Sequence, residues 1–282
     1  MKPNSRFLNQ PKSFWANIRT ISEQVGYTVK GKGQILVPSA GQIKIALEKA
    51  GLDSSHIMDD LGNNTQLGEL LYEYFRYRAK ILNEYVESRL MDVLKARRLF
   101  NSLKKKLKPK CPLPMNKQKG DKKTPAYFTG IINMLIETSA DGLECDYEPR
   151  QLTTVTRDNA PLRTLSRRID GAFQSSVNPI AVWEIKEYYY TTTFGSRVAD
   201  GVYETLLDGM ELSELNDSEG IHIRHYLMVD DYYTWWKCGR SYLCRLFDTL
   251  HMGYIDEVLF GHEVIERMPD IVREWVDIIR HR

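Results

Sequence analysis

The chain has 282 residues, of which 42% are hydrophobic and 27% are charged. This composition is ordinary for a globular protein, so it excludes wholesale disorder, and the length allows one large domain or two modest ones. The formal net charge is only +2, so a nucleic-acid partner has to be recognised by local basic patches rather than by an overall excess.

Two short helices are predicted in the N-terminal part of the chain. The first runs from Ser13 to Val25, with apolar residues at helical spacing and Gly26 as its stop. The second follows Ser39, a favourable N-cap residue, and ends at Gly51. Two short helices joined by a turn form either a DNA-reading module or ordinary packing helices, and we favour packing as the commoner case.

Residues 66–107 are predicted to form one long helix or two collinear helices. Apolar residues such as Leu71, Tyr74 and Leu90 keep a helical stripe along this stretch. The opposite face carries arginines and lysines, including Arg78. A solvated face is the simplest interpretation of these cations, and a dimer or scaffold surface is the alternative.

The next stretch is the clearest shift in composition. Between Lys104 and Lys123 the chain has nine lysines and one acidic residue, and prolines and a glycine interrupt regular structure. We expect a mobile connector here, which either lies along a phosphate backbone or is simply solvated. The predicted organisation is a mostly helical N-terminal region (1–107), a basic connector (108–124) and a catalytic domain (125–282).

A helix and two strand-like runs follow the connector. The periodicity predicts a helix over residues 125–138, with Glu137 at its end. A strand is expected at 152–156, and a hairpin loop then leads into a second strand, 164–169, that ends at Asp170.

Asp170, Glu184 and Lys186 are the residues with the clearest chemical potential. Glu184 and Lys186 lie two apart in a run of strand-forming residues, 180–188, so they share one face of a strand. A hairpin turning at Asn178-Pro179 brings Asp170 next to Glu184. Two neighbouring carboxylates repel each other unless a cation lies between them, and hard oxygen ligands favour Mg²⁺. The alternative without a functional role is a Glu–Lys pair on the solvent-exposed face of a strand, with Asp170 far from Glu184 in the fold.

The remaining elements predict a mixed sheet. The polar-aromatic stretch 188–195 either contacts bases or sugars or simply finishes the strand. Helices at 197–210, 240–250 and 270–279 alternate with strands at 225–229 and 255–260. This order is typical of an α/β fold in which helices flank the sheet.

The motif Ile169-Asp170, thirteen intervening residues, Glu184-Ile185-Lys186 resembles that of the PD-(D/E)XK nuclease superfamily, which includes many type II restriction endonucleases. Ile169 replaces the usual proline, a position that supplies no chemistry. The resemblance implies a restriction-endonuclease-like mixed β-sheet flanked by helices. It also implies that Asp170 and Glu184 bind Mg²⁺ and that Lys186 orients or activates water. The resemblance also implies a further metal ligand from the helix before the motif, and Glu137 at the end of that helix is the candidate.

The function implied by this resemblance is Mg²⁺-dependent, site-specific cleavage of double-stranded DNA by a homodimer or heterodimer. The alternatives are a repair or junction-resolving nuclease with the same core, and a non-catalytic DNA-binding protein. The histidines are interpreted as structural, and no glycine-rich phosphate loop is present in the sequence.

A cytoplasmic location is expected. The N-terminus has no apolar signal core, and no apolar run is long enough to span a membrane. The four cysteines show neither metal-type spacing nor a dense disulfide framework, which favours reduced thiols.

Overall fold

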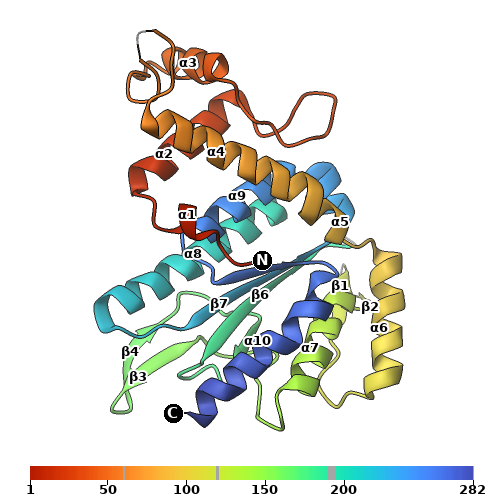
Figure 1. Ribbon diagram of the computed structural model, residues 1–282. Helices are drawn as coiled ribbons and strands as arrows, with labels where there is room; N and C mark the ends of the chain where they lie inside the picture. Colours follow the sequence, from red (N-terminus) through yellow and green to blue (C-terminus); the bar gives the residue numbers. More distant parts are fainter. Residues whose placement is uncertain (60, 119–120, 190–194, 282) are drawn as a thin grey trace.

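The computed structural model describes residues 1–282 except residues 60, 119–120, 190–194 and 282 (Figure 1). Part of the aromatic stretch 188–195 therefore lies outside the described residues. Among the residues described, no helix combines the length and the apolar character needed to cross a bilayer.

The N-terminal region is helical. Its elements are α1 (Ser5–Leu8), α2 (Lys12–Val25), α3 (Ala40–Lys49), α4 (Gln66–Lys80), a π-helical segment (Ile81–Val86) and α5 (Glu87–Arg89). The predicted helices α2 and α3 are confirmed, and Ser39 and Gln42 form a capping box at the start of α3. The helices pack around one apolar core that they share with α9 (Arg240–His251) of the C-terminal region.

The prediction of one straight helical run over residues 66–107 is wrong. The run ends at Arg89, Leu90 adopts an extended backbone, and α6 (Val93–Leu107) starts anew after Asp92. The Asp92 side chain accepts a hydrogen bond from the Lys95 N–H at 2.8 Å, so it caps the new helix. Figure 1 shows α6 running in a different direction from α4.

The prediction of an irregular connector at 108–124 is wrong in part, because residues 108–114 form no helix or strand but a hairpin follows them. The α6 helix continues to Leu107, and strands β1 (Met115–Gln118) and β2 (Asp121–Pro125) then pair as an antiparallel hairpin. The prolines Pro112 and Pro114 precede β1, where they do not interrupt its ladder. Helix α6 packs on α7 and shares the core of the C-terminal region, although the predicted border placed it in the N-terminal region.

A hairpin precedes the central sheet. Helix α7 (Tyr127–Ser139) is close to its predicted bounds. Strands β3 (Thr154–Arg157) and β4 (Ala160–Thr164) pair through a turn in which Asp158 and Asn159 have positive φ. The strand predicted at 164–169 is wrong, because the chain leaves β4 at Thr164 and runs irregularly to Asp170. The Ser166 side chain and backbone N–H donate to Glu211 there.

The central sheet has four strands in the order β5-β6-β7-β8. Their bounds are Gly171–Phe173, Ala181–Glu187, Arg224–Asp230 and Glu257–Phe260. Strand β5 pairs antiparallel with β6, whereas β6, β7 and β8 are parallel. The parallel strands are joined by α8 (Ser196–Glu219), and by a π-helical segment (Tyr232–Cys238) with α9 (Arg240–His251).

Helices cover both faces of this sheet. Helices α7 and α10 (Glu263–Arg280) cover one face, where Trp183 and Trp275 stack at 5.7 Å between ring centroids. Helices α8 and α9 cover the other face, and the N-terminal region packs against α9 (Figure 1). The predicted mixed α/β architecture with a helical N-terminal region is therefore confirmed at this level.

Candidate functional site

The pairing of β5 and β6 brings Asp170 to Glu184. Gly171 lies opposite Trp183 in the antiparallel register, so the preceding residue, Asp170, lies beside Glu184. The Asp170 N–H donates to Glu184 Oε1 at 3.2 Å, and the Ile185 N–H donates to Asp170 Oδ2 at 2.8 Å. The alternative with a distant Asp170 is thereby excluded.

Lys186 lies on the same face of β6 as Glu184, as predicted. Its Nζ is 2.8 Å from Glu184 Oε2 and 2.7 Å from Oε2 of Glu204 on α8. Helix α8 approaches this close because Gly201 faces the strand, where an added Cβ would lie 3.3 Å from Lys186 Cδ. The exposed fractions of Glu184 and Lys186 are 0% and 5%, so their charges are balanced within the protein rather than by water.

Arg167 joins the same cluster from the irregular segment before β5. Its guanidinium lies 2.9 Å from Glu184 Oε1 and 2.6 Å from Oδ2 of the buried Asp208 on α8. The resulting group, called here the β6 cluster, contains four carboxylates and two cations. Its members are Asp170, Glu184, Glu204, Asp208, Arg167 and Lys186.

The protonation of the β6 cluster follows from burial and from the excess of acid. Asp170 is exposed at the surface, but desolvation of its carboxyl by the surrounding protein and then the charge of Glu184 raise its pKa to about 6. The same two causes raise the pKa of Asp208 to about 7. Burial acts to raise the pKa of Glu184, but Lys186 and Arg167 outweigh it, so that pKa is lowered. For Lys186, burial acts to lower the pKa, but Glu184 and Asp170 outweigh it, so the ammonium keeps its charge at neutral pH.

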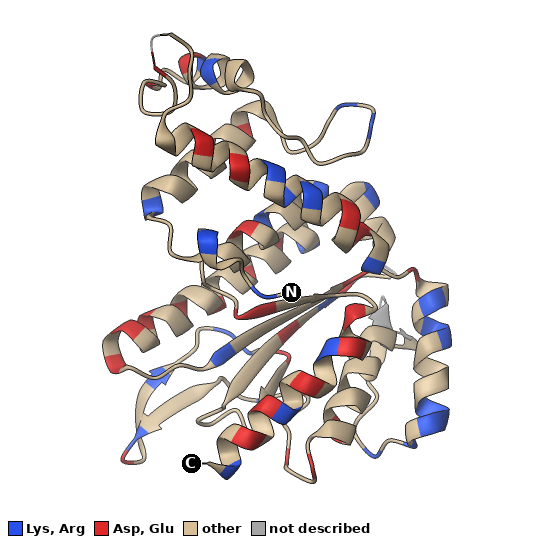
Figure 2. Ribbon diagram, viewed as in Figure 1, with Lys and Arg blue, Asp and Glu red and all other residues tan. Residues whose placement is uncertain are grey.

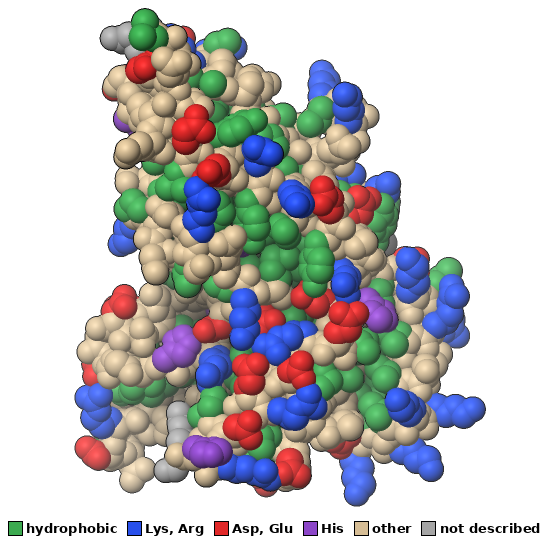
Figure 3. All heavy atoms as spheres, in the orientation of Figure 1, with side chains coloured by type: hydrophobic (Ala, Val, Ile, Leu, Met, Phe, Trp, Pro, Cys, Tyr) green, Lys and Arg blue, Asp and Glu red, His purple; other side chains and the backbone are tan. Residues whose placement is uncertain are grey.

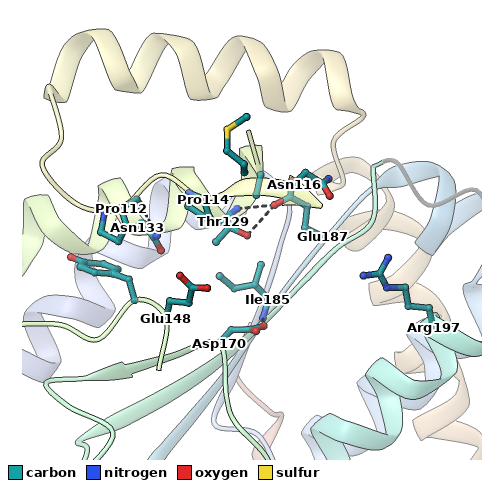
Figure 4. A pocket seen from close by; sticks show the side chains of 13 residues that line it. Pro112, Pro114, Asn116, Thr129, Asn133, Glu148, Asp170, Ile185, Glu187 and Arg197 are labelled. Atoms are coloured by element: carbon teal, nitrogen blue, oxygen red, sulfur yellow. Dashed lines mark hydrogen bonds between the residues drawn. The ribbon is translucent and has the colours of Figure 1, made fainter. Parts of the chain in front are cut away.

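Asp170 opens onto a pocket of about 340 Å³ at the carboxyl end of β6 (Figure 4). The pocket lies between α7 and β6, and Arg197 of α8 lines its far side. Glu187, the last residue of β6, accepts hydrogen bonds from the Thr129 N–H and hydroxyl, both at 3.0 Å, and burial raises its pKa to about 7. Ligands of open α/β sheets bind at the carboxyl ends of strands, so the pocket has the expected place for a site.

Acceptor oxygens without partners line this pocket. Within the described part of the chain, Glu187 Oε1 and Asn133 Oδ1 are buried and have no hydrogen-bond partner. Asp170 uses only Oδ2 in a hydrogen bond, so Oδ1 has no donor among the described residues. A cation or a donor-rich ligand fits a pocket of this character, because unpaired buried acceptors are costly.

The β6 cluster is rich in carboxylates, which are the ligands that Mg²⁺ prefers. Asp170 supplies an unpaired oxygen, and the surplus of carboxylates over cations favours one more positive charge. No group of three or more His, Cys, Asp or Glu within the described residues forms a ready-made metal site. Mg²⁺ commonly uses one or two carboxylates together with water and substrate phosphate. Asp170 has an oxygen open to such an ion, whereas both oxygens of Glu184 are paired with Arg167 and Lys186.

Glu137, the predicted further ligand, is already paired with the backbone that follows α6. Its two carboxylate oxygens accept hydrogen bonds from the Lys110 N–H, each at 3.0 Å. They hold the chain that leaves α6 against α7. The helical periodicity predicted correctly that Glu137 lies at the end of its helix. It gave no information about which residues contact that end of the helix.

Three acidic residues near the motif were missed in the sequence. Glu204 and Asp208 lie four residues apart on α8, so they share one helix face, and this spacing was the available signal. Glu187 follows the motif directly and points to the opposite face of β6 from Glu184, toward α7. The histidines His222 and His225 bond to Asp256 and to the Tyr254 carbonyl, as expected for structural residues.

Sequence comparisons match two families. Residues 91–275 match a family described as Domain of unknown function (DUF7687), and residues 1–85 match a family described as Domain of unknown function (DUF7690). No curated protein and no solved structure matches the sequence. The two matches meet where the N-terminal helical run ends and the chain turns into α6. Because the longer match spans more than half of the sequence, the chain belongs to the family Domain of unknown function (DUF7687).

Proposed function

We propose that this protein is a Mg²⁺-dependent endonuclease that hydrolyses phosphodiester bonds of double-stranded DNA. The observation that carries the proposal is the meeting of Asp170, Glu184 and Lys186, of which Asp170 lines the pocket beside β6. The order of elements supports it as well. Asp170 directly precedes β5, the Glu-x-Lys pair lies in β6, and β7 is parallel to β6 in a sheet flanked by helices, which is similar to the PD-(D/E)XK core.

The proposed chemistry divides the roles among the three side chains. Asp170 and Glu184 would hold the ion, and a bound Mg²⁺ supplies the positive charge that polarises the scissile phosphate and stabilises the leaving oxygen. Lys186 keeps its proton, because its neighbours raise its pKa. We therefore assign Lys186 to hydrogen bonding and charge stabilisation of the attacking water and phosphate, rather than to removing a proton.

A restriction-type role follows from the same proposal. A chain with one such site cuts one strand at a time, so cutting both strands of a duplex site calls for two copies acting together. We propose a homodimer that cuts specific sites in the cytoplasm.

The test is digestion of supercoiled plasmid by the purified protein in Mg²⁺ and in EDTA. Wild-type protein should cut only in Mg²⁺, and Asp170→Asn, Glu184→Gln and Lys186→Met should each lower the rate by at least about a hundredfold. Glu214→Gln is the matched control, because Glu214 is an exposed α8 carboxylate paired with Arg163 outside the β6 cluster. Near-ultraviolet circular dichroism of each variant checks folding. Undiminished cutting by Glu184→Gln would refute the assigned roles.

The pattern of products separates two nuclease classes. A discrete set of bands from unmethylated DNA would support site-specific cutting. Cutting confined to branched or damaged duplexes would instead support a repair or junction-resolving nuclease with the same core.

A second candidate function is non-catalytic DNA binding, in which the β6 cluster is a closed ion-pair network. The observation in its favour is that both oxygens of Glu184 are already paired, with Arg167 and with Lys186. Duplex binding that EDTA does not change, together with no nicking in Mg²⁺, Mn²⁺ or Ca²⁺, would establish this function in place of the nuclease.

A further inference from the structure

Helix α6 and the residues after it carry a dense group of unpaired cations. Residues 93–110 contain no aspartate or glutamate. The basic side chains there are all exposed, and none forms an ion pair with a described residue; they are Lys95, Arg97, Arg98, Lys104, Lys105, Lys106, Lys108 and Lys110. Figure 2 shows blue segments along α6 and no red segment on that helix. Elsewhere the arginines mostly have carboxylate partners, such as Glu73 for Arg6 and Glu257 for Arg267.

The apolar side of α6 is already covered. Ala96 and Phe100 are buried against α7 in the core of the C-terminal region. The basic side therefore faces solvent, and basic side chains project from this edge of the molecule in Figure 3. A membrane surface is a poor match, because a helix bound there needs a free apolar face and α6 has used its own in packing.

A hollow at the start of α6 has a cationic lining. Its volume is about 490 Å³, and none of its lining residues is acidic. The polar side chains lining it are the hydroxyls of Ser88 and Ser102, the cations of Arg89, Lys95 and Arg98, and the imidazole of His262. Of these, Arg89 has a carboxylate partner, Glu266. Hydroxyl and cationic donors together are the groups that bind phosphate oxygens.

The start of α6 lies near the carboxyl edge of the sheet, as does the Asp170 pocket. The Met91 N–H just before α6 bonds at 2.7 Å to Asp230, the last residue of β7, and His262 follows β8. The segment that leaves α6 lines the Asp170 pocket through Pro112 and Pro114.

We propose that the exposed face of α6, with the hollow at its start, binds the phosphate backbone of a DNA duplex. The exposed charges of α6 alone indicate that the ligand is a polyanion. The choice of duplex DNA among polyanions rests on the proposed function. A helix of this length extends roughly 22 Å, which is long enough to face several phosphates. These contacts position the duplex and carry no base information.

The test measures duplex binding in EDTA, where the proposed cleavage cannot occur. The variant replaces Lys95, Arg98, Lys105 and Lys106, which share one side of α6, by glutamine, which preserves helix propensity. The matched control replaces four exposed lysines of the N-terminal region by glutamine, namely Lys30, Lys32, Lys44 and Lys49. Fluorescence anisotropy of a labelled duplex over a series of salt concentrations gives the affinity, and phosphatidylserine vesicles are the comparison.

Each neutralised phosphate contributes about 0.9 to the slope of log affinity against log salt. The α6 variant should therefore lower the magnitude of that slope by about 3 to 4, and the control should leave it unchanged. Equal slopes for wild type and the α6 variant, no duplex binding by the wild type, or binding to vesicles in preference to duplex would each overturn the inference. If binding depends on α6 but no plasmid is cut, the inference stands and the nuclease proposal fails.

Discussion

The neighbours of Lys186 keep its ammonium charged, and this distinguishes its proposed role from the metal-binding role proposed for the two carboxylates. Its ammonium bonds to Glu184 and Glu204 rather than to water. Removing it leaves the carboxylates in place and makes the β6 cluster more negative. Variants of Lys186 and variants of the carboxylates should therefore differ in whether they still bind the ion.

We therefore expect Lys186→Met to lose cleavage while keeping, or strengthening, the binding of Mn²⁺ as a substitute for Mg²⁺. Asp170→Asn should lose both properties, because it removes a ligand. Parallel measurements of plasmid cleavage and Mn²⁺ titration give the two values for each variant. Loss of Mn²⁺ binding in Lys186→Met would show that the lysine supports the ion itself.

Asp230 is a buried carboxyl outside the β6 cluster, and it makes stability depend on pH. Its side chain accepts the Met91 N–H and the Tyr189 hydroxyl, and burial raises its pKa from 3.8 to about 8. At pH values between 3.8 and about 8, Asp230 keeps its proton in the folded protein but has lost it in the unfolded chain. Stability contributed by this group therefore falls as pH rises from about 4 to about 8.

The Asp230→Asn variant should lose this pH dependence, because an amide does not titrate. Urea unfolding at pH 5 and pH 8 should show a smaller drop in the free energy of unfolding than in wild type. Asp217→Asn, at an exposed position of α8, is the control and should retain the wild-type drop. An unchanged drop in Asp230→Asn would contradict the assignment.

At the scale of elements, the start of α6 depends on one side chain. The Asp92 carboxylate accepts the Lys95 N–H at the point where the N-terminal helical run has ended. Replacing an N-cap aspartate by alanine typically costs about 1 kcal/mol of stability.

We expect Asp92→Ala to lower the free energy of unfolding by about 1 kcal/mol, as measured by urea titration. Ser102→Ala, at an exposed position in the middle of the same helix, should change it little. If both variants have the same stability, Asp92 does not act as the cap.

The local sequence predicted most of the helices and strands, but it did not predict which of them contact one another. The period of two in β6 placed Glu184 and Lys186 on one face, and the turn at Asn178 returned the chain so that Asp170 met them. Neither Arg167 nor Asp208 was identified as a member of this site. Their contact depends on where α8 crosses the sheet, which the close approach at Gly201 sets. The break before α6 was missed because Asp92 resembles any exposed acid until its hydrogen bond is seen.

At the scale of the whole molecule, a buried ion pair links the N-terminal region to the sheet region. Arg78 of α4 was predicted to be solvated, but it is 1% exposed and lies 3.0 Å from Asp248 Oδ2 on α9. It also bonds to Ser22 of α2, and the Tyr74 hydroxyl donates to Asp248. The helical stripe identified the apolar face of α4 but could not show that a charged residue beside it has a buried partner.

Breaking such a pair leaves an uncompensated buried charge, so Arg78→Met should cost about 3–5 kcal/mol. The double variant Arg78→Met/Asp248→Leu should recover part of that loss, since no charge then remains. Arg76→Met, on the exposed side of the same helix, is the control. Chemical denaturation of the four proteins tests this, and an Arg78→Met variant as stable as Arg76→Met would contradict the role of the pair.

The central claim is that Asp170 and Glu184 share one divalent cation, and titration of Mn²⁺ into the apoprotein by calorimetry tests it most directly. The wild type and Glu214→Gln should bind Mn²⁺ at one class of site, and Asp170→Asn and Glu184→Gln should each lose that binding. Equal binding by all four proteins, or no binding by the wild type, would contradict the claim.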